Sequence, residues 1–290
     1  MIELAGWDMR PELAELWRVC FHEPKRYPDF FLNNYFRPKD CLIYRISDRI
    51  AAAVYLLPAR IAPEGAQAHY IFAAGTLPSF RSRGFMASLL AYAALYGAKR
   101  GDKYSVVLPA TQPLYSFYER CGYFDYYKIR SVPVTRACLE QLASQLPAGR
   151  VLASSCELNM LRNSFLSGRK GSVLWSDEWF HFTVSFSSVY GDELVCSGSA
   201  GHRSYAICRK ADKSTCSVRE TMAAPDSFPG LAAAILKRFP AETYEFRLPS
   251  GGGLFPGEGL EERCGMLRPI GGTILEKSIA PAPYLGLALD

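Results

Sequence analysis

Apolar and polar positions divide the first half of the chain into segments with helical spacing and segments with strand composition. Residues 11–21 form one apolar helical face through Leu13, Leu16 and Trp17, which recur every three or four residues. Short runs rich in β-branched and aromatic residues, bounded by turn residues, predict strands. The expected elements are helices at 11–21, 85–100 and 113–121, short helices and loops at 22–40, and strands at 41–46, 50–57, 66–76, 104–108 and 123–133.

The second half repeats this order of elements in a more divergent form. Residues 134–158 have connecting character, with the clearest break at Pro147-Ala148-Gly149. Residues 175–190 begin with helical spacing, although 183–189 suit a strand equally well. A helix at 229–239 and strands at 193–198, 204–210, 215–222, 243–248 and 265–270 follow. The repeated order indicates a divergent internal duplication, so we expect two units, residues 1–148 and 149–290.

Composition and charge narrow the class of protein. The 290 residues are 49% hydrophobic and 21% charged, which is typical of a globular protein. The net charge of +5 comes without blocks of like charge, so we expect no nucleic-acid partner. The acidic first residues do not resemble a signal peptide, and the longest apolar run, 86–98, is too short to span a bilayer. We therefore expect a cytoplasmic protein without a membrane partner.

Nine cysteines raise the question of a metal site or disulfides. Their spacing is irregular and no Cys-x-x-Cys pair occurs. Cys196, His202, Cys208 and Cys216 come nearest to a ligand set, but their gaps fit no common zinc module. Reduced thiols in the core, and no bound metal, are the better interpretation.

A short basic loop joins the strand expected at 66–76 to the helix expected at 85–100. Free N–H groups of the first helical turn, the helix dipole and a glycine that permits close approach together form a cradle for an anion. Arg81 and Arg83 add formal charge beside Gly84. We therefore expect this loop to hold a pyrophosphate. The matching segment of the second half, 223–230, carries Asp226 and no arginine, and should not hold one.

The loop and a later segment together resemble the GNAT family of N-acetyltransferases. The run Thr76-Leu77-Pro78-Ser79-Phe80-Arg81-Ser82-Arg83-Gly84-Phe85-Met86 is similar to the acetyl-CoA signature of that family, except that Met86 stands where a small residue is usual. Tyr118-Glu119-Arg120-Cys121-Gly122-Tyr123 resembles its second motif, a tyrosine four residues before a Gly-aromatic pair. The resemblance covers about residues 1–133, and more loosely the whole chain as a tandem arrangement.

The resemblance implies an α/β (α+β) protein with two GNAT-like units, each a mixed, mainly antiparallel sheet flanked by helices, the second unit being degenerate. It also implies transfer of an acetyl group from acetyl-CoA, as co-substrate, to a primary amine by direct attack. The strand end would pair with the pantetheine arm and the loop would bind the phosphates. The implied cofactor-binding residues are Ala74, Gly75, Thr76, Leu77, Arg81, Ser82, Arg83, Gly84, Phe85, Met86 and Ala87.

Two candidate catalytic roles follow from the resemblance. Tyr118 matches the acid that protonates the departing thiolate, and a phenol with a pKa of about 10 suits an alkyl thiol. Tyr115, one turn earlier, is the substitute. Glu23, Asp29 or a chain of waters could act as the general base. His69, well before the strand end, is more consistent with a core or surface histidine.

The acceptor is expected to be a small-molecule amine or a peptide amine. Its pocket could be lined by an aromatic cluster, which could equally be a packed lid on the sheet; the cluster comprises Tyr27, Phe30, Phe31, Tyr35 and Phe36. Two other functions stay open: a Fem-type aminoacyl transferase, against which the intact loop and the lack of a basic arm speak, and a CoA-binding regulatory module without turnover. The acceptor, the acyl chain and the oligomeric state stay open as well.

Overall fold

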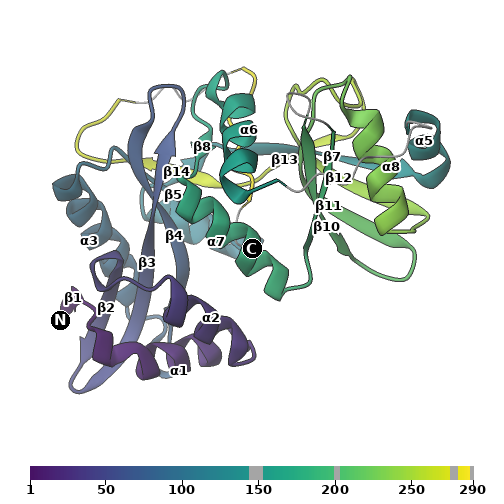
Figure 1. The fold of residues 1–290 in the computed structure, drawn as a ribbon. Helices are drawn as coiled ribbons and strands as arrows, with labels where there is room; N and C mark the ends of the chain where they lie inside the picture. The colour runs from purple at the N-terminus through teal and green to yellow at the C-terminus, as the bar shows by residue number, and fades with distance from the viewer. Residues whose placement is uncertain (144–152, 199–202, 275–279, 288–290) are drawn as a thin grey trace.

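Two mixed sheets with helices on their faces make up the protein (Figure 1). The computed structural model describes residues 1–143, 153–198, 203–274 and 280–287. The first sheet contains, in spatial order, β1 (Ile2–Leu4), β2 (Cys41–Ile46), β3 (Arg49–Ile61), β4 (Ala66–Thr76), β5 (Tyr104–Val107), β14 (Met266–Pro269) and β6 (Phe124–Asp125), and β8 (Val173–Leu174) pairs with β3. The second contains β13 (Leu260–Arg263), β7 (Lys128–Thr135), β12 (Thr243–Pro249), β11 (Thr215–Met222), β10 (Ser204–Lys210) and β9 (Glu193–Ser197). The predicted α/β class with two mixed sheets is confirmed.

The first sheet is buried on both faces. Helices α1 (Arg10–Phe21) and α2 (Arg26–Asn34) cover one face, and α3 (Phe85–Arg100) and α4 (Gln112–Arg120) cover the other. Strand β3 shows this directly, because alternate residues join different cores: Ala53, Tyr55 and Leu57 pack with α1 and α2, whereas Ala52, Val54 and Leu56 pack with α3 and α4.

The second sheet has the same design as the first. Helix α8 (Phe228–Arg238) with α5 (Arg136–Leu142) covers its outer face, while α6 (Ser155–Ser167) and α7 (Asp177–Val189) lie between the two sheets (Figure 1). Strands β11 and β12 are parallel and joined through α8, as β4 and β5 are parallel and joined through α3. The order β9-β10-β11-α8-β12 thus repeats β2-β3-β4-α3-β5, as the internal duplication predicted.

The two sheets exchange strands along the chain. Strand β7, from the first half of the sequence, pairs with β12 and β13 in the second sheet. Strand β14, from the end of the sequence, lies between β5 and β6 in the first sheet. The division expected at residue 148 falls outside the described residues and stays a prediction, but both sheets draw strands from both sides of it.

Two predicted elements were wrong in detail, and one that was left open is settled. Residues 134–158 were expected to connect the units, but they hold α5 and the start of α6, which begins with a capping box between Ser154 and Glu157. Residues 183–189, for which helix and strand were both open, belong to helix α7, which buries Trp179, Phe182 and Phe186. The single strand expected at 123–133 is two strands, β6 and β7, which lie in different sheets.

All nine cysteines are free thiols in the structure. Cys41, Cys208, Cys216 and Cys264 are buried, as core thiols should be, whereas Cys156 is exposed. No group of three or more His, Cys, Asp or Glu among the described residues could hold a metal ion, and His202 lies outside those residues. None of the described helices is long and apolar enough to cross a membrane.

Candidate functional site

The site begins where β4 and β5 separate. The two parallel strands pair only from Ala68 to Tyr70 with Tyr104 to Val106, and β4 then continues to Thr76 without β5 beside it. On its other edge β4 stays paired with β3, where Val54 faces both Ala73 and Ala74 in a bulge. Ala73 has a left-handed φ of 44°, which a non-glycine residue adopts only under local constraint. The splayed edge leaves backbone groups of β4 available to an extended ligand.

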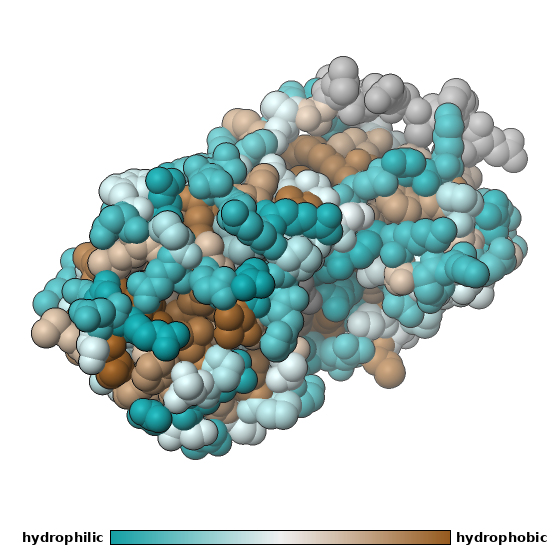
Figure 2. Space-filling view, turned by 90° about the horizontal axis from the view of Figure 1, so that it is seen from below, coloured by the Kyte–Doolittle hydropathy of each residue, from teal (hydrophilic) through white to brown (hydrophobic). Residues whose placement is uncertain are grey.

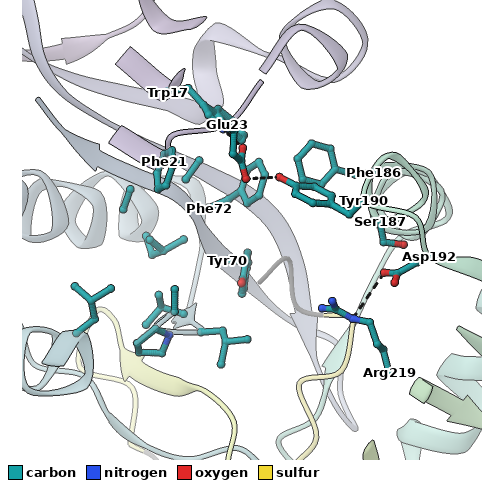
Figure 3. Close-up of a pocket in the computed structure, with 18 of the residues that line it drawn as sticks. Trp17, Phe21, Glu23, Tyr70, Phe72, Phe186, Ser187, Tyr190, Asp192 and Arg219 are labelled. Carbon is teal, nitrogen blue, oxygen red and sulfur yellow. Dashed lines mark hydrogen bonds and ion pairs between the residues drawn. The ribbon is translucent and has the colours of Figure 1, made fainter. Parts of the chain in front are cut away.

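A cavity of about 270 Å³ fills this separation (Figure 3). Its walls come from β4, from the segment after β5, from α1 and α4, and from α7 and the second sheet. Aromatic and charged side chains share the lining, among them Trp17, Phe21, Glu23, Tyr70, Tyr118, Phe186, Tyr190, Asp192, Arg209 and Arg219. The volume lies just below the usual range for ligand pockets, about 300–1,000 Å³, so the cavity suits a small ligand.

The cavity reaches the surface near the end of α1. Phe21 lines it and is 38% exposed. Viewed from below, the N-terminal half of the molecule shows apolar residues between polar ones on this side (Figure 2).

The loop after β4 has the geometry of an anion cradle. Gly84 is the N-cap of α3 with φ 78°, and Ser82 is also left-handed with φ 61°. A Cβ atom on Gly84 would meet no other atom within 4 Å, so the space in front of the helix start is open. The first helical turn directs its unpaired N–H groups into that space. Residues 81–84 are all exposed, as a loop that receives phosphates must be.

The two loop arginines are placed differently. Arg81 folds back, and its Nε donates to the carbonyl of Thr76 at 3.1 Å. Burial raises the pKa of the Cys20 thiol, while the nearby Arg81 guanidinium acts in the opposite direction, so Arg81 lies against α1. Arg83 lies over the ring of Phe80 at 5.6 Å. Both guanidinium groups remain at the end of β4, beside the helix start.

Gly75 makes the close approach that the sequence indicated, but its neighbour is α1. A Cβ atom there would lie 3.2 Å from both Cys20 and Leu16 side chains. The glycine therefore lets α1 pack directly on the strand end. The bulge itself lies at Ala73 and Ala74, one residue earlier in the chain.

The structure separates the two candidate tyrosines. Tyr118 lines the cavity and packs edge-on against Phe117 and Tyr123. Burial raises its pKa well above the usual value of 10, so the phenol stays protonated. Tyr115 is also buried, but it does not line the cavity, and Arg263 stacks on its ring at 4.0 Å. The geometry thus favours Tyr118 over Tyr115 as the candidate acid.

Of the acidic candidates, only Glu23 lies at the cavity. One of its oxygens accepts from Trp17 Nε1 at 2.7 Å and the other from Tyr190 Oη at 2.6 Å (Figure 3). Burial, followed by the bond to Glu23, raises the pKa of Tyr190, which therefore remains the donor. Asp29 lies on α2 near Lys25, away from this cavity. His69 is fully buried and paired with Asp102 at 2.8 Å, so it is a core histidine as expected.

The aromatic cluster of α2 is a packed lid rather than a pocket lining. Phe31 packs against Trp17, Tyr55 and Phe72 with ring centroids 4.9 to 5.7 Å apart. Tyr27 stacks on Tyr190 at 4.2 Å, behind the cavity wall. None of the five cluster residues lines the cavity. The aromatic lining comes instead from α1, β4, α4 and α7.

One end of the cavity is polar and belongs to the second half of the chain. Asp192 is 4% exposed and accepts from Arg209 Nε at 2.6 Å, and Arg219 Nε lies 3.7 Å from its other oxygen. Sequence reasoning missed these residues, because no motif marks them and they are distant in sequence from the loop.

The corresponding place in the second unit, between the ends of β11 and β12, holds a smaller cavity of about 170 Å³. The loop after β12 carries Phe255, whose ring packs against Phe228 at the start of α8 and Phe246 of β12. Buried Arg130 holds that loop by donating to the carbonyls of Leu254, Phe255 and Glu258. This packing, together with Asp226 before α8, supports the expectation that the second unit binds no CoA.

Comparison with known proteins agrees with this geometry. Residues 4–124 match the family model described as an acetyltransferase (GNAT) domain. A probable N-acyltransferase from Enterococcus faecalis V583 is 16% identical with a TM-score of 0.73, over 93% of this chain and 72% of that one. A GCN5-related N-acetyltransferase from Anabaena variabilis ATCC 29413 is 16% identical with a TM-score of 0.76, over 92% and 72%. A tandem GNAT protein from the clavulanic acid biosynthesis pathway is 13% identical with a TM-score of 0.53, over 94% and 99%.

No curated protein matches the sequence. The splayed strand, the loop and the fold define the class of the protein as a transferase of acyl groups. Residues 4–124 thus match a GNAT acetyltransferase domain, and the fold of the chain is similar to that of GNAT proteins, a tandem one among them.

Proposed function

We propose that the protein transfers an acetyl group from acetyl-CoA to a primary amine. One observation supports this most directly. The splayed edge of β4, the arginine loop and the open helix start at Gly84 follow one another along the chain, as the arm and the phosphates of CoA would require. The pantetheine arm would pair with Ala74, Gly75 and Thr76. The pyrophosphate would sit on the backbone from Leu77 and from Arg81 to Ala87. All of the proposed cofactor-binding residues would then lie before residue 148, and the second unit would enclose the acceptor.

The reaction follows from what lines the cavity. The neutral amine nitrogen attacks the thioester carbonyl, so a C–N bond forms as the C–S bond breaks. A backbone N–H at the β4 bulge would stabilise the developing oxyanion. Tyr118 would donate its proton to the departing sulfur, and the amine would lose a proton to Glu23 or to water bound there. The hydrogen bonds from Trp17 and Tyr190 hold the Glu23 carboxylate at the cavity wall.

The position of Tyr118 favours turnover over a binding module without chemistry. A regulatory CoA-binding domain has no need of a protonated phenol on the wall of the acyl cavity. The basic loop likewise favours a CoA thioester over charged tRNA as the donor.

The first test is ligand-induced stabilisation. We expect acetyl-CoA to raise the melting temperature, because at 100 times its Kd a ligand adds about 2.7 kcal/mol to the free energy of unfolding. Free pantetheine should stabilise far less, since it lacks the pyrophosphate that the loop binds. A thermal-shift series with acetyl-CoA, CoA and pantetheine measures this. No shift with millimolar acetyl-CoA would rule out the proposed function.

The second unit gives a separate expectation for stoichiometry. Because the segment before α8 carries Asp226 and no arginine, and the cavity there is only about 170 Å³, we expect one CoA per chain. Calorimetric titration measures the number directly. Two equivalent CoA sites per chain would contradict the division of roles between the two units.

A further inference from the structure

The smaller cavity of the second unit has the features of a separate binding site. We infer that it binds a small carboxylate with a short apolar chain, whose oxygens are held by Arg130 and Thr221. Neither residue lines the larger cavity of the first unit. The binding of such a ligand requires none of the acetyl-transfer chemistry proposed above.

The cavity lies where β11 and β12 separate. These parallel strands pair only over residues 215–218 and 243–246, and each then continues without the other beside it, to Met222 and Pro249. Phe165 at the end of α6 lines the cavity and is 41% exposed, so the cavity reaches the surface there. The second unit thus has the strand separation that forms the larger cavity of the first unit, but not the arginine loop beside it.

Two buried side chains bring unpartnered polar atoms to this cavity. Thr221 is 3% exposed and Arg130 is 7% exposed, and both line it. The Oγ1 of Thr221 and the Nε of Arg130 are buried without a hydrogen-bond partner among the described residues. Because a buried polar group without a partner is costly, a ligand that pairs with both atoms is bound favourably.

The sheet places these two side chains on the same face. Thr221 lies opposite Ala206 in the sheet, and Arg130 lies opposite Leu248. Both of these neighbours belong to the core beneath α8. Residues directly opposite each other share a face, so Thr221 and Arg130 are both on the α8 side of the sheet.

The guanidinium group of Arg130 has no acidic partner in the described part of the chain. Its two Nη atoms donate to three backbone carbonyls of the loop 254–258. Arg169 also lines the cavity, and its Nη1 donates to the carbonyls of Ser250 and Ala282. Carbonyl dipoles stabilise a cation but leave its charge uncompensated, whereas buried charges are normally paired with an opposite charge. A bound anion would supply that charge.

The size and the walls of the cavity favour a carboxylate over other anions. The Nε–H of Arg130 and the hydroxyl of Thr221 are two donors, which match the two oxygens of a carboxylate. The rest of the wall is largely apolar, with Leu166, Met222 and Leu248 among its side chains. The further oxygens of phosphate or sulfate would be buried there without donors. At about 30 Å³ for each water-sized group, the volume of about 170 Å³ suits a ligand the size of butyrate.

The test measures the binding of small carboxylates to the full chain by calorimetric titration. Acetate, propionate, butyrate and hexanoate are each compared with the neutral amide of the same chain length, and phosphate and sulfate are titrated as other anions. We expect propionate or butyrate to bind most tightly. The affinity of the best carboxylate should exceed that of its amide at least 10-fold, because a hydrogen bond to a charged group contributes about 10- to 100-fold.

Thr221→Val locates the site. Valine keeps the branched shape of threonine, and the lost hydroxyl has no partner in the protein, so the variant should melt no lower than the unchanged protein. Its affinity for butyrate should fall about 10-fold. Thr183→Val is the matched control, since Thr183 is also buried but donates to the carbonyl of Phe180 at 2.8 Å and does not line this cavity. Its affinity for butyrate should be unchanged.

Several outcomes would overturn the assignment. They are no binding of any of these carboxylates, equal binding of butyrate and butyramide, tighter binding of phosphate or sulfate than of every carboxylate, and unchanged butyrate affinity in folded Thr221→Val. None of these measurements uses acetyl-CoA, so failure of the proposed function does not affect them, and their failure does not affect the proposed function.

Discussion

Replacing Tyr118 by phenylalanine should lower kcat by about 10²- to 10⁴-fold, the usual contribution of a general acid. The phenol hydroxyl is needed only as the thiolate leaves, so CoA affinity should change little. The ring of phenylalanine keeps the edge-on contacts with Phe117 and Tyr123, so the fold should be retained. Steady-state CoA release, together with a CoA titration, measures both quantities.

Tyr115→Phe is the matched control. It removes a hydroxyl from a buried tyrosine of the same short helix, but one that does not line the cavity. We expect kcat within a few-fold of the unchanged protein. If Tyr118→Phe were equally active, the proton would have to come from another group, and the assignment of Tyr118 would be wrong.

The pH dependence gives an independent check on Tyr118. Burial raises its pKa above 10, and the protonated phenol is the form that can donate. Because the pKa of Tyr118 in the folded protein is raised, the phenol can donate its proton at neutral pH. It loses this ability only when the pH rises through that raised pKa. Ionisation of Tyr118 should therefore cause no fall in kcat below pH 10. A fall near neutral pH that Tyr118→Phe removes would contradict this.

The loop and its flanking elements could be predicted from sequence because their signals are local. A glycine at a helix start, arginines beside it and alternating strand residues all lie within about 25 residues. The structure puts Gly84 at the N-cap of α3 and Tyr118 at the cavity, both as expected. The binding roles of these residues stay predictions.

Long-range pairing was beyond the same reasoning. The four residues of β14 read as a strand, but nothing in them says that they lie between β5 and β6. The hydrophobic pattern of a strand specifies which face is buried, not which neighbour it has. The same holds for Asp192, Arg209 and Arg219, which meet Glu23 at one cavity only because α7 and the second sheet pack against the first unit.

Local capping signals were available but were overlooked. Ser154 and Glu157 have the Ser-x-x-Glu spacing of a capping box, which marks the start of α6. The break at Pro147-Ala148-Gly149 favoured a linker over the whole of residues 134–158. Residue 149 and its neighbours lie outside the described part of the chain, whereas α6 is an ordinary helix of 13 residues.

Gly84→Glu is expected to abolish CoA binding while the protein remains folded. The N-cap position faces open space, so the new side chain can extend without a clash, into the region proposed for the pyrophosphate. Two unit charges about 4 Å apart near a surface repel by about 4 kcal/mol, which corresponds to roughly a 10³-fold loss of affinity for each phosphate charge opposed. Calorimetric titration with CoA should show no measurable heat.

A control variant, Gly84→Gln, separates the effect of the new charge on CoA affinity from the effect of backbone strain on stability. A side chain at φ 78° costs about 1–2 kcal/mol of stability, and Gly84→Gln incurs the same cost without the charge. Gly84→Gln should therefore melt like Gly84→Glu but keep much more of its CoA affinity. A negative charge at the start of α3 also interacts favourably with the helix dipole, so Gly84→Glu should be at least as stable as Gly84→Gln. CoA affinity retained within a few-fold in Gly84→Glu would place the phosphates elsewhere, because no cradle built on this helix start tolerates a carboxylate at its centre.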